Sequence, residues 1–150
     1  MFLIYLDLCC FNRPFDDQRQ TRVRLESEAK LHLQQLVKDK TVALAWSYVV
    51  GYENDHNPII SRRDAIAGWK MLASVSIAPS QAILDQAVGL VETHGLKNFD
   101  ALHVACAMTV GARLFVTTDD AILRKLKLFV PMQVVSPIEA LSILEKWYEN

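Results

Sequence analysis

The chain has 150 residues, of which 51% are hydrophobic and 22% are charged, and its formal net charge is −1 at pH 7. This length predicts one domain that can bury a core, and the composition is typical of a water-soluble globular protein. The near-neutral charge excludes a strong attraction of the whole molecule to nucleic acid, which would have to be contacted through local basic clusters or a bound metal.

The apolar segments and the cysteines indicate where such a protein would be found. No apolar stretch approaches the roughly 20 residues that a membrane-spanning helix needs. The apolar run at the N-terminus has no basic residue before it ends at Asp7, which is not the layout of a signal peptide. Cys9, Cys10 and Cys106 are odd in number and lack the spacing of a zinc site. We expect a soluble cytoplasmic protein with reduced cysteines and no membrane contact.

The hydrophobic periodicity predicts short apolar strands that alternate with helices. In chain order we expect a strand at 2–6, a loop at Pro14 and 16–20, a helix at 21–38, a strand at 41–45, a helix from Ser47, a helix at 61–73, a strand at 75–78, helices at 80–94 and 99–110, a strand at 113–116, a short helix to about 127, a strand at 133–135 and a helix from Pro137.

Residues that favour helix ends fix several of these boundaries. Gly95 and Gly111 are placed to end two helices. The candidate N-terminal caps are Ser47, Ser61, Asn98 and either Thr118 or Asp119.

The strands and helices together predict the fold class. The apolar stripe of helix 21–38 consists of Leu25, Ala29, Leu33 and Leu36. Strands separated by helices imply a parallel sheet with helices on both faces. We therefore expect an α/β fold of three layers around a mostly five-stranded parallel sheet, forming one domain over residues 1–150.

Four acids lie where predicted strands and helices meet. Asp7 ends the first strand, Asp119 follows the strand at 113–116, Glu53 lies in the helix after the second strand, and Asp100 lies in the first turn of an apolar helix. In open α/β sheets, ligands bind beyond the carboxyl ends of the strands. If the first strand and the strand at 113–116 are neighbours, Asp7 and Asp119 face one crevice.

Taken one at a time, these acids have simpler explanations. Asp119 can be a helix cap, Asp100 can favour the helix dipole, and Glu53 can be a solvated helix residue. As a set they point to a metal site, because several carboxylates in one crevice repel one another until a cation binds. Mg²⁺ and Mn²⁺ accept carboxylate and water ligands.

Four segments resemble, in order and spacing, the acid-bearing segments of the PIN-domain family, which includes the VapC-type toxins. The first is the strand ending at Asp7, and the second runs from Ser47 to Glu53. The third is Asp-Ala-Leu-His-Val-Ala from Asp100, and the fourth is Phe-Val-Thr-Thr-Asp-Asp, which contains Asp119. The resemblance spans nearly the whole chain.

The resemblance implies a metal-dependent endoribonuclease that hydrolyses phosphodiester bonds in single-stranded RNA. It implies that Asp7, Asp100 and Asp119 bind Mg²⁺ or Mn²⁺ directly or through water. Glu53 would bind the metal through water or orient the nucleophile. It also implies a bacterial toxin, a cognate antitoxin as its partner, and a homodimer.

The residues that would support the metal site agree less closely with the family. Ser47, Thr117 and Asp120 are candidate supporting groups. The family's first acid is often followed by Thr and Asn, whereas Leu8 and Cys9 stand here. This departure keeps open an alternative, a catalytically inactive PIN-like module that works by protein contact.

Other α/β sites lack their motifs in this chain. It has no P-loop and no G-x-S-x-G sequence. Leu8 and Cys9 break the Asp-x-Asp of a haloacid-dehalogenase phosphatase, and no acid follows the third strand as in a receiver domain.

Several further side chains remain open between a structural and a functional role. We favour solvated helix faces over RNA contacts for the basic clusters Arg13, Arg19, Arg22 and Arg24, Arg62 and Arg63, and Arg124, Lys125 and Lys127. His103 shares a helical side with Asp100, but we favour packing against the sheet. The tryptophans Trp46, Trp69 and Trp147 are expected in the core or at an interface.

Overall fold

The computed structural model describes residues 2–149, and the side chains of residues 2–146. It contains a five-stranded parallel sheet in the order β3-β2-β1-β4-β5. The strands are β1 (Phe2–Leu6), β2 (Val42–Ser47), β3 (Val75–Ile77), β4 (Leu114–Val116) and β5 (Gln133–Val135).

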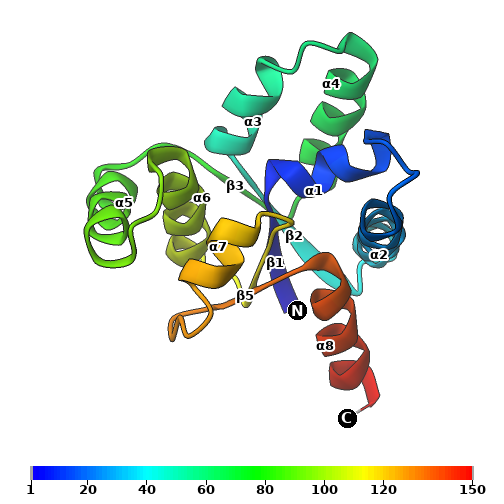
Figure 1. Cartoon of the computed structure of the whole chain (residues 1–150). Coiled ribbons are helices and arrows are strands. Elements are labelled where there is room, and N and C mark those ends of the chain that lie inside the picture. The colour runs from blue at the N-terminus through cyan, green and yellow to red at the C-terminus, as the bar shows by residue number, and fades with distance from the viewer. Residues whose placement is uncertain (1, 150) are drawn as a thin grey trace.

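The helices surround this sheet, with α5 and α6 on one side and α2 and α8 on the other (Figure 1). They are α1 (Leu8–Asn12), α2 (Thr21–Lys38), α3 (Tyr48–Asp55), α4 (Ile60–Ala67), α5 (Gln81–His94), α6 (Asn98–Thr109), α7 (Asp120–Lys125) and α8 (Pro137–Glu149), with 3₁₀ turns at Arg13–Phe15 and Gly68–Leu72. The predicted α/β class, with a five-stranded parallel sheet and helices on both faces, is confirmed. None of the helices in the described part of the chain is both long and apolar enough to cross a bilayer.

The central strands are apolar because both of their faces are covered. Ile4 of β1 pairs with Leu44 of β2 and with Leu114 of β4, and all three side chains are fully buried. The chain passes from β1 outward to β2 and β3, then returns to β4 on the other side of β1. The strand order therefore reverses at β1 and β4, where ligands bind in folds of this kind.

Most predicted boundaries agree with the structure to within two residues. Helix α2 spans the predicted residues, Gly95 ends α5 in the left-handed conformation at φ 67°, and Ser47 caps α3 by accepting a hydrogen bond from the Val50 amide. A glycine is favoured at such a left-handed helix end because it has no Cβ.

Three local predictions were wrong. Helix α4 begins at Ile60 without a side-chain cap, so Ser61 lies inside the helix, and at Gly68 the chain tightens into a 3₁₀ turn. Glycine is a poor helix former, which explains why the helix does not continue to residue 73. Asn98 does not cap α6, because Lys97 is the cap residue and makes no side-chain cap bond.

The buried face of α2 also differs from the predicted stripe. Leu25 is 46% exposed, whereas Glu26 and Lys30 are buried beside Ala29 and Leu33. An ion pair with Arg13 compensates the cost of burying the Glu26 carboxylate. This face of α2 is therefore buried although it carries polar residues.

The tryptophans agree with their predicted role where they are described. Trp46 is buried in the core, and Trp69 packs against it. The side chain of Trp147 lies outside the described residues.

Candidate metal centre

Asp7 stands at the carboxyl end of β1, between β2 and β4. Its amide donates to the Val116 carbonyl at 3.0 Å, which extends the β1–β4 ladder by one bond. Its Oδ1 accepts from the Leu8 amide at 2.8 Å, and its Oδ2 accepts from the Thr117 hydroxyl at 2.9 Å. The carboxylate is thus held from two sides and is only 7% exposed.

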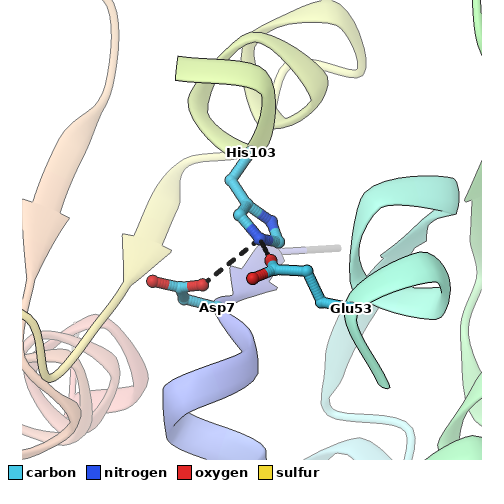
Figure 2. Close-up of side chains that lie close together, drawn as sticks. All are labelled: Asp7, Glu53 and His103. Carbon is cyan, nitrogen blue, oxygen red and sulfur yellow. Dashed lines mark hydrogen bonds and ion pairs between the residues drawn. The ribbon is translucent and has the colours of Figure 1, made fainter. Parts of the chain in front are cut away.

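Glu53 and His103 meet Asp7 from two other elements, α3 and α6 (Figure 2). His103 Nε2 is hydrogen-bonded to Glu53 Oε1 and lies 3.5 Å from Asp7 Oδ1. One donor atom from each residue lies within 4.8 Å of the others, close enough to share one cation. The structure therefore brings Asp7 and Glu53 together, two of the four predicted acids. His103 is buried by packing and is also part of this cluster.

A chain of hydrogen bonds holds His103 from behind. The Tyr5 hydroxyl lies 2.6 Å from His103 Nδ1 and 2.6 Å from the Ser47 hydroxyl. Burial raises the pKa of Tyr5 well above its usual value, so the hydroxyl keeps its proton. Ser47 thus both caps α3 and supports the tyrosine that contacts His103.

The burial of His103 and the charges around it act on its pKa in opposite directions. Removal from water alone would lower the pKa of the imidazole, but the negative charge of Asp7, the hydrogen bond and charge of Glu53, and the charge of Asp100 together raise it. The negative field of the site outweighs the loss of water around the ring.

Asp119 stands at the neighbouring strand end and is linked to Asp7 through Thr117. Its Oδ1 caps α7 by accepting from the amides of Ala121 and Ile122 at 2.8 and 3.3 Å. The Thr117 hydroxyl accepts from the Asp119 amide at 3.1 Å while it donates to Asp7. Asp119 therefore caps a helix, which was the simpler explanation of this acid in the sequence. It also lies next to the cluster of Asp7, Glu53 and His103.

Asp100 lies in the first turn of α6 and is half-buried. Burial raises its pKa, and the negative charges of Asp7 and Asp119 raise it further. Asp100 therefore lies within electrostatic reach of both Asp7 and Asp119. Asp100 and Asp119 do not belong to the close cluster of Asp7, Glu53 and His103.

Asp120 is directed to a different partner. Its carboxylate, 71% exposed, forms two hydrogen bonds with Arg22 at 2.8 and 2.9 Å. This arginine lowers the pKa of Asp120. Asp120 is not brought into the cluster.

One residue of the site was missed in the sequence, and a second was noted only as a departure from the family pattern. Tyr5 lies two positions before Asp7, and this period-2 spacing places both side chains on one face of the strand, a signal that could have been used. Cys9 lies 3.4 Å from Asp7 Oδ2, and its sulfur accepts from the Thr118 amide at 3.3 Å. A thiol thus occupies the position where the resembled family often has an amide.

The predicted basic cluster around α2 is largely paired with acids. Arg13 binds the buried Glu26 at 2.9 Å, and Arg19 binds Asp17 at 2.6 Å. Arg22 binds Asp120. The neighbouring acids offset the positive charge of the three arginines, and Arg13 has a structural role because it pairs with the buried Glu26.

The donor atoms fit a divalent cation. Carboxylates are preferred ligands of Mg²⁺ and Mn²⁺, and imidazole is a common ligand of transition metals. The donor atoms of Asp7, Glu53 and His103 are close enough together for one such ion, and a cation there would offset the repulsion between the carboxylates of this region. Fold and site together define an α/β protein with an acidic centre at the carboxyl edge of its sheet, beside the reversal of strand order.

The family follows from comparison with known sequences. The model of the PIN domain matches residues 4–127, so this chain belongs to the PIN-domain family. A search of curated protein sequences finds no match to the chain.

Solved structures share the fold at low sequence identity. A chain in a toxin–antitoxin complex from Klebsiella pneumoniae is 19% identical with a TM-score of 0.59, and the alignment covers 89% of this chain and 97% of that one. A chain of VapBC2 from Rickettsia felis, bound to a DNA fragment from their promoter, is 15% identical with a TM-score of 0.56, covering 90% and 98%. A chain of FitAcB from Neisseria gonorrhoeae is 16% identical with a TM-score of 0.55, covering 90% and 98%.

Proposed function

We propose that this chain is a divalent-metal-dependent endoribonuclease that hydrolyses phosphodiester bonds in single-stranded RNA. The observation that carries the proposal is the meeting of Asp7, Glu53 and His103 within 4.8 Å, at the strand end beside Asp119. Membership of the PIN-domain family supports it. A bound Mg²⁺ or Mn²⁺ would supply the chemistry of activating a water and neutralising charge on the scissile phosphate.

Some side chains would bind the cation, and others would orient the attacking water or the carboxylates. Asp7, Asp100 and Asp119 would hold the cation directly or through water, and Glu53 would bind it through water or orient the attacking water. Thr117 would fix the Asp7 carboxylate through the hydrogen bond of 2.9 Å. Ser47 would act at a distance through Tyr5 and His103. Pre-ordered side chains of this kind lower the reorganisation needed at the moment of reaction.

We also propose that the chain is the toxin of a bacterial toxin–antitoxin pair, cytoplasmic, homodimeric and held by a cognate antitoxin. The toxin–antitoxin complexes among its structural neighbours support this partner. We propose that residues 1–150 form one PIN domain, since Ala140 and Leu144 of α8, beyond the matched residues, are buried in the same core as the sheet.

Calorimetric titration with Mn²⁺ tests the proposal first, on the wild type and on Asp7→Asn, Asp119→Asn and Asp64→Asn. Asp64 is an exposed acid on α4 whose substitution serves as the matched control. We expect the two site variants to weaken Mn²⁺ binding and the control to leave it unchanged. Circular dichroism would check that each variant is folded.

RNA cleavage then tests the activity itself. We expect the wild type to cleave single-stranded RNA with Mn²⁺ or Mg²⁺, and EDTA or the Asp7→Asn substitution to abolish cleavage. A folded wild type that binds no metal at millimolar Mn²⁺, with or without RNA present, would contradict the proposal. The inactive PIN-like binding module would then be the better description.

A further inference from the structure

One ring nitrogen of His103 faces two carboxylates. Nε2 is hydrogen-bonded to Glu53 Oε1 and lies 3.5 Å from Asp7 Oδ1. An imidazole N–H carries one proton in that direction and cannot bond both carboxylates well. A cation at this position could be shared by the nitrogen and both oxygens, since the three atoms lie within 4.8 Å of one another.

The other ring nitrogen is held by an oxygen that can accept a proton. Nδ1 lies 2.6 Å from the Tyr5 hydroxyl, which can accept from Nδ1–H while it donates to Ser47 at 2.6 Å. Histidines that bind metals commonly donate their second N–H to an oxygen, which fixes the ring and leaves the first nitrogen free to ligate. His103 is 1% exposed, so this arrangement has little freedom to rotate.

We propose that Nε2 of His103 is a nitrogen ligand of the cation site and makes the site prefer transition-metal ions to Mg²⁺. The inference rests on the cation site of the proposed function and adds a ligand to its carboxylates. Mg²⁺ prefers oxygen ligands, whereas imidazole favours later first-row ions. The competing arrangement is a proton on Nε2, with His103 holding Glu53 by a hydrogen bond and no contact with the metal.

Pulsed electron paramagnetic resonance of bound Mn²⁺ distinguishes the two arrangements in the wild type, and one substitution then checks the assignment to His103. We expect the wild type to show hyperfine coupling from a directly bound nitrogen. The coupling should change to the ¹⁵N pattern when the histidines are labelled with ¹⁵N. It should vanish in His103→Gln, whose amide still fits the site and still forms hydrogen bonds.

Calorimetry with Co²⁺ and Mg²⁺ tests the preference. We expect His103→Gln to weaken Co²⁺ binding about tenfold or more and Mg²⁺ binding less, so that the ratio of the two dissociation constants falls. Tyr5→Phe, which removes the hydroxyl but keeps the ring, should weaken Co²⁺ binding by about 10- to 100-fold. Tyr52→Phe is the control, because Tyr52 is exposed and stacks on Phe99 away from this chain of hydrogen bonds.

Two results would overturn the inference in different ways. If Mn²⁺ binds and Asp7→Asn weakens it, but no nitrogen coupling appears and His103→Gln weakens Co²⁺ and Mg²⁺ equally, His103 positions Glu53 and the proposed function stands. If the folded wild type binds none of the three ions, the cation site itself is wrong and both proposals fail.

Discussion

The hydroxyl of Thr117 donates a hydrogen bond of 2.9 Å to the Asp7 carboxylate across two neighbouring strand ends. The same oxygen accepts from the amide of Asp119 at 3.1 Å. One buried side chain thus fixes the positions of two acids that are 112 positions apart in the sequence. This contact depends on the pairing of β1 with β4.

We expect Thr117→Val to weaken Mn²⁺ binding about tenfold, because the variant keeps the shape of the side chain and loses the hydroxyl that orients Asp7. Folding stability should fall by about 1 kcal/mol, since the partly buried Asp119 amide loses its acceptor. Calorimetry and urea unfolding would measure the two effects.

Thr93→Val is the control for this substitution. Thr93 is an exposed residue of α5 whose hydroxyl bonds the Gly89 carbonyl. It should leave Mn²⁺ binding unchanged. Unaltered Mn²⁺ affinity in folded Thr117→Val would show that Asp7 does not need this hydroxyl.

Ser47 and Ser80 offer a matched pair of helix caps. Each accepts a hydrogen bond of 3.2 Å from a backbone amide three residues later, at Val50 and Ile83. We expect each serine-to-alanine change to lower stability by about 1–2 kcal/mol through the lost cap. Ser47→Ala should in addition weaken Mn²⁺ binding, because Ser47 also contacts Tyr5.

Urea unfolding and Mn²⁺ calorimetry on both variants would separate capping from site support. Equal Mn²⁺ affinities in Ser47→Ala and Ser80→Ala would show that the contact between Ser47 and Tyr5 has no influence on the cation site.

Glu26 and Asp120 bind the same arginine in different surroundings. Glu26 is 2% exposed and pairs with Arg13 and Arg22, whereas Asp120 is exposed and pairs with Arg22. We expect Glu26→Gln to lower stability by about 2–3 kcal/mol, because the partly buried Arg13 loses its buried carboxylate partner and is left with the longer ion pair to Asp16. Asp120→Asn should leave the urea midpoint unchanged, since solvent screens an exposed pair. Similar midpoints for the two variants would contradict this difference.

The fold could be predicted from local signals. Apolar runs identified the strands, and Gly95 and Pro137 marked a helix end and a helix start. The placement of Asp7 and Asp119 at neighbouring strand ends could also be predicted, because parallel strands end at one edge of the sheet and only the adjacency of the two strands had to be assumed.

Other features of the site depend on side-chain packing that no local pattern contains. The contact of Glu53 with His103 joins residues 50 positions apart, on helices whose relative position the sequence does not specify. Glu26 and Lys30 resemble solvated residues of an amphipathic helix, yet both are buried. Their burial depends on partners from other elements, an arginine for Glu26 and aromatic rings for Lys30.

Lys30 should make the stability of the protein depend on pH. Its ammonium group lies 5.1 Å from the centre of the Phe11 ring and 5.6 Å from that of Trp69, and the residue is 2% exposed. Burial lowers its pKa from 10.5 to about 7, and the positive charge of Lys38 also lowers it. Between these two values the unfolded chain binds the extra proton, so unfolding becomes less favourable as pH rises from about 7 toward 10.5.

We expect Lys30→Met to stabilise the protein by about 2 kcal/mol or more at pH 6, where the wild type must bury the charged ammonium group. The gain should shrink as pH rises from about 7 toward 10.5, because the folded wild type then buries a neutral amine and the cost of removing the proton from the unfolded chain falls. Lys127→Met is the control, because it removes the ammonium group of an exposed lysine elsewhere in the chain. Urea unfolding at pH 6, 8 and 9.5 would measure these differences. A gain for Lys30→Met that does not vary with pH would show that its ammonium group keeps an ordinary pKa in the folded protein.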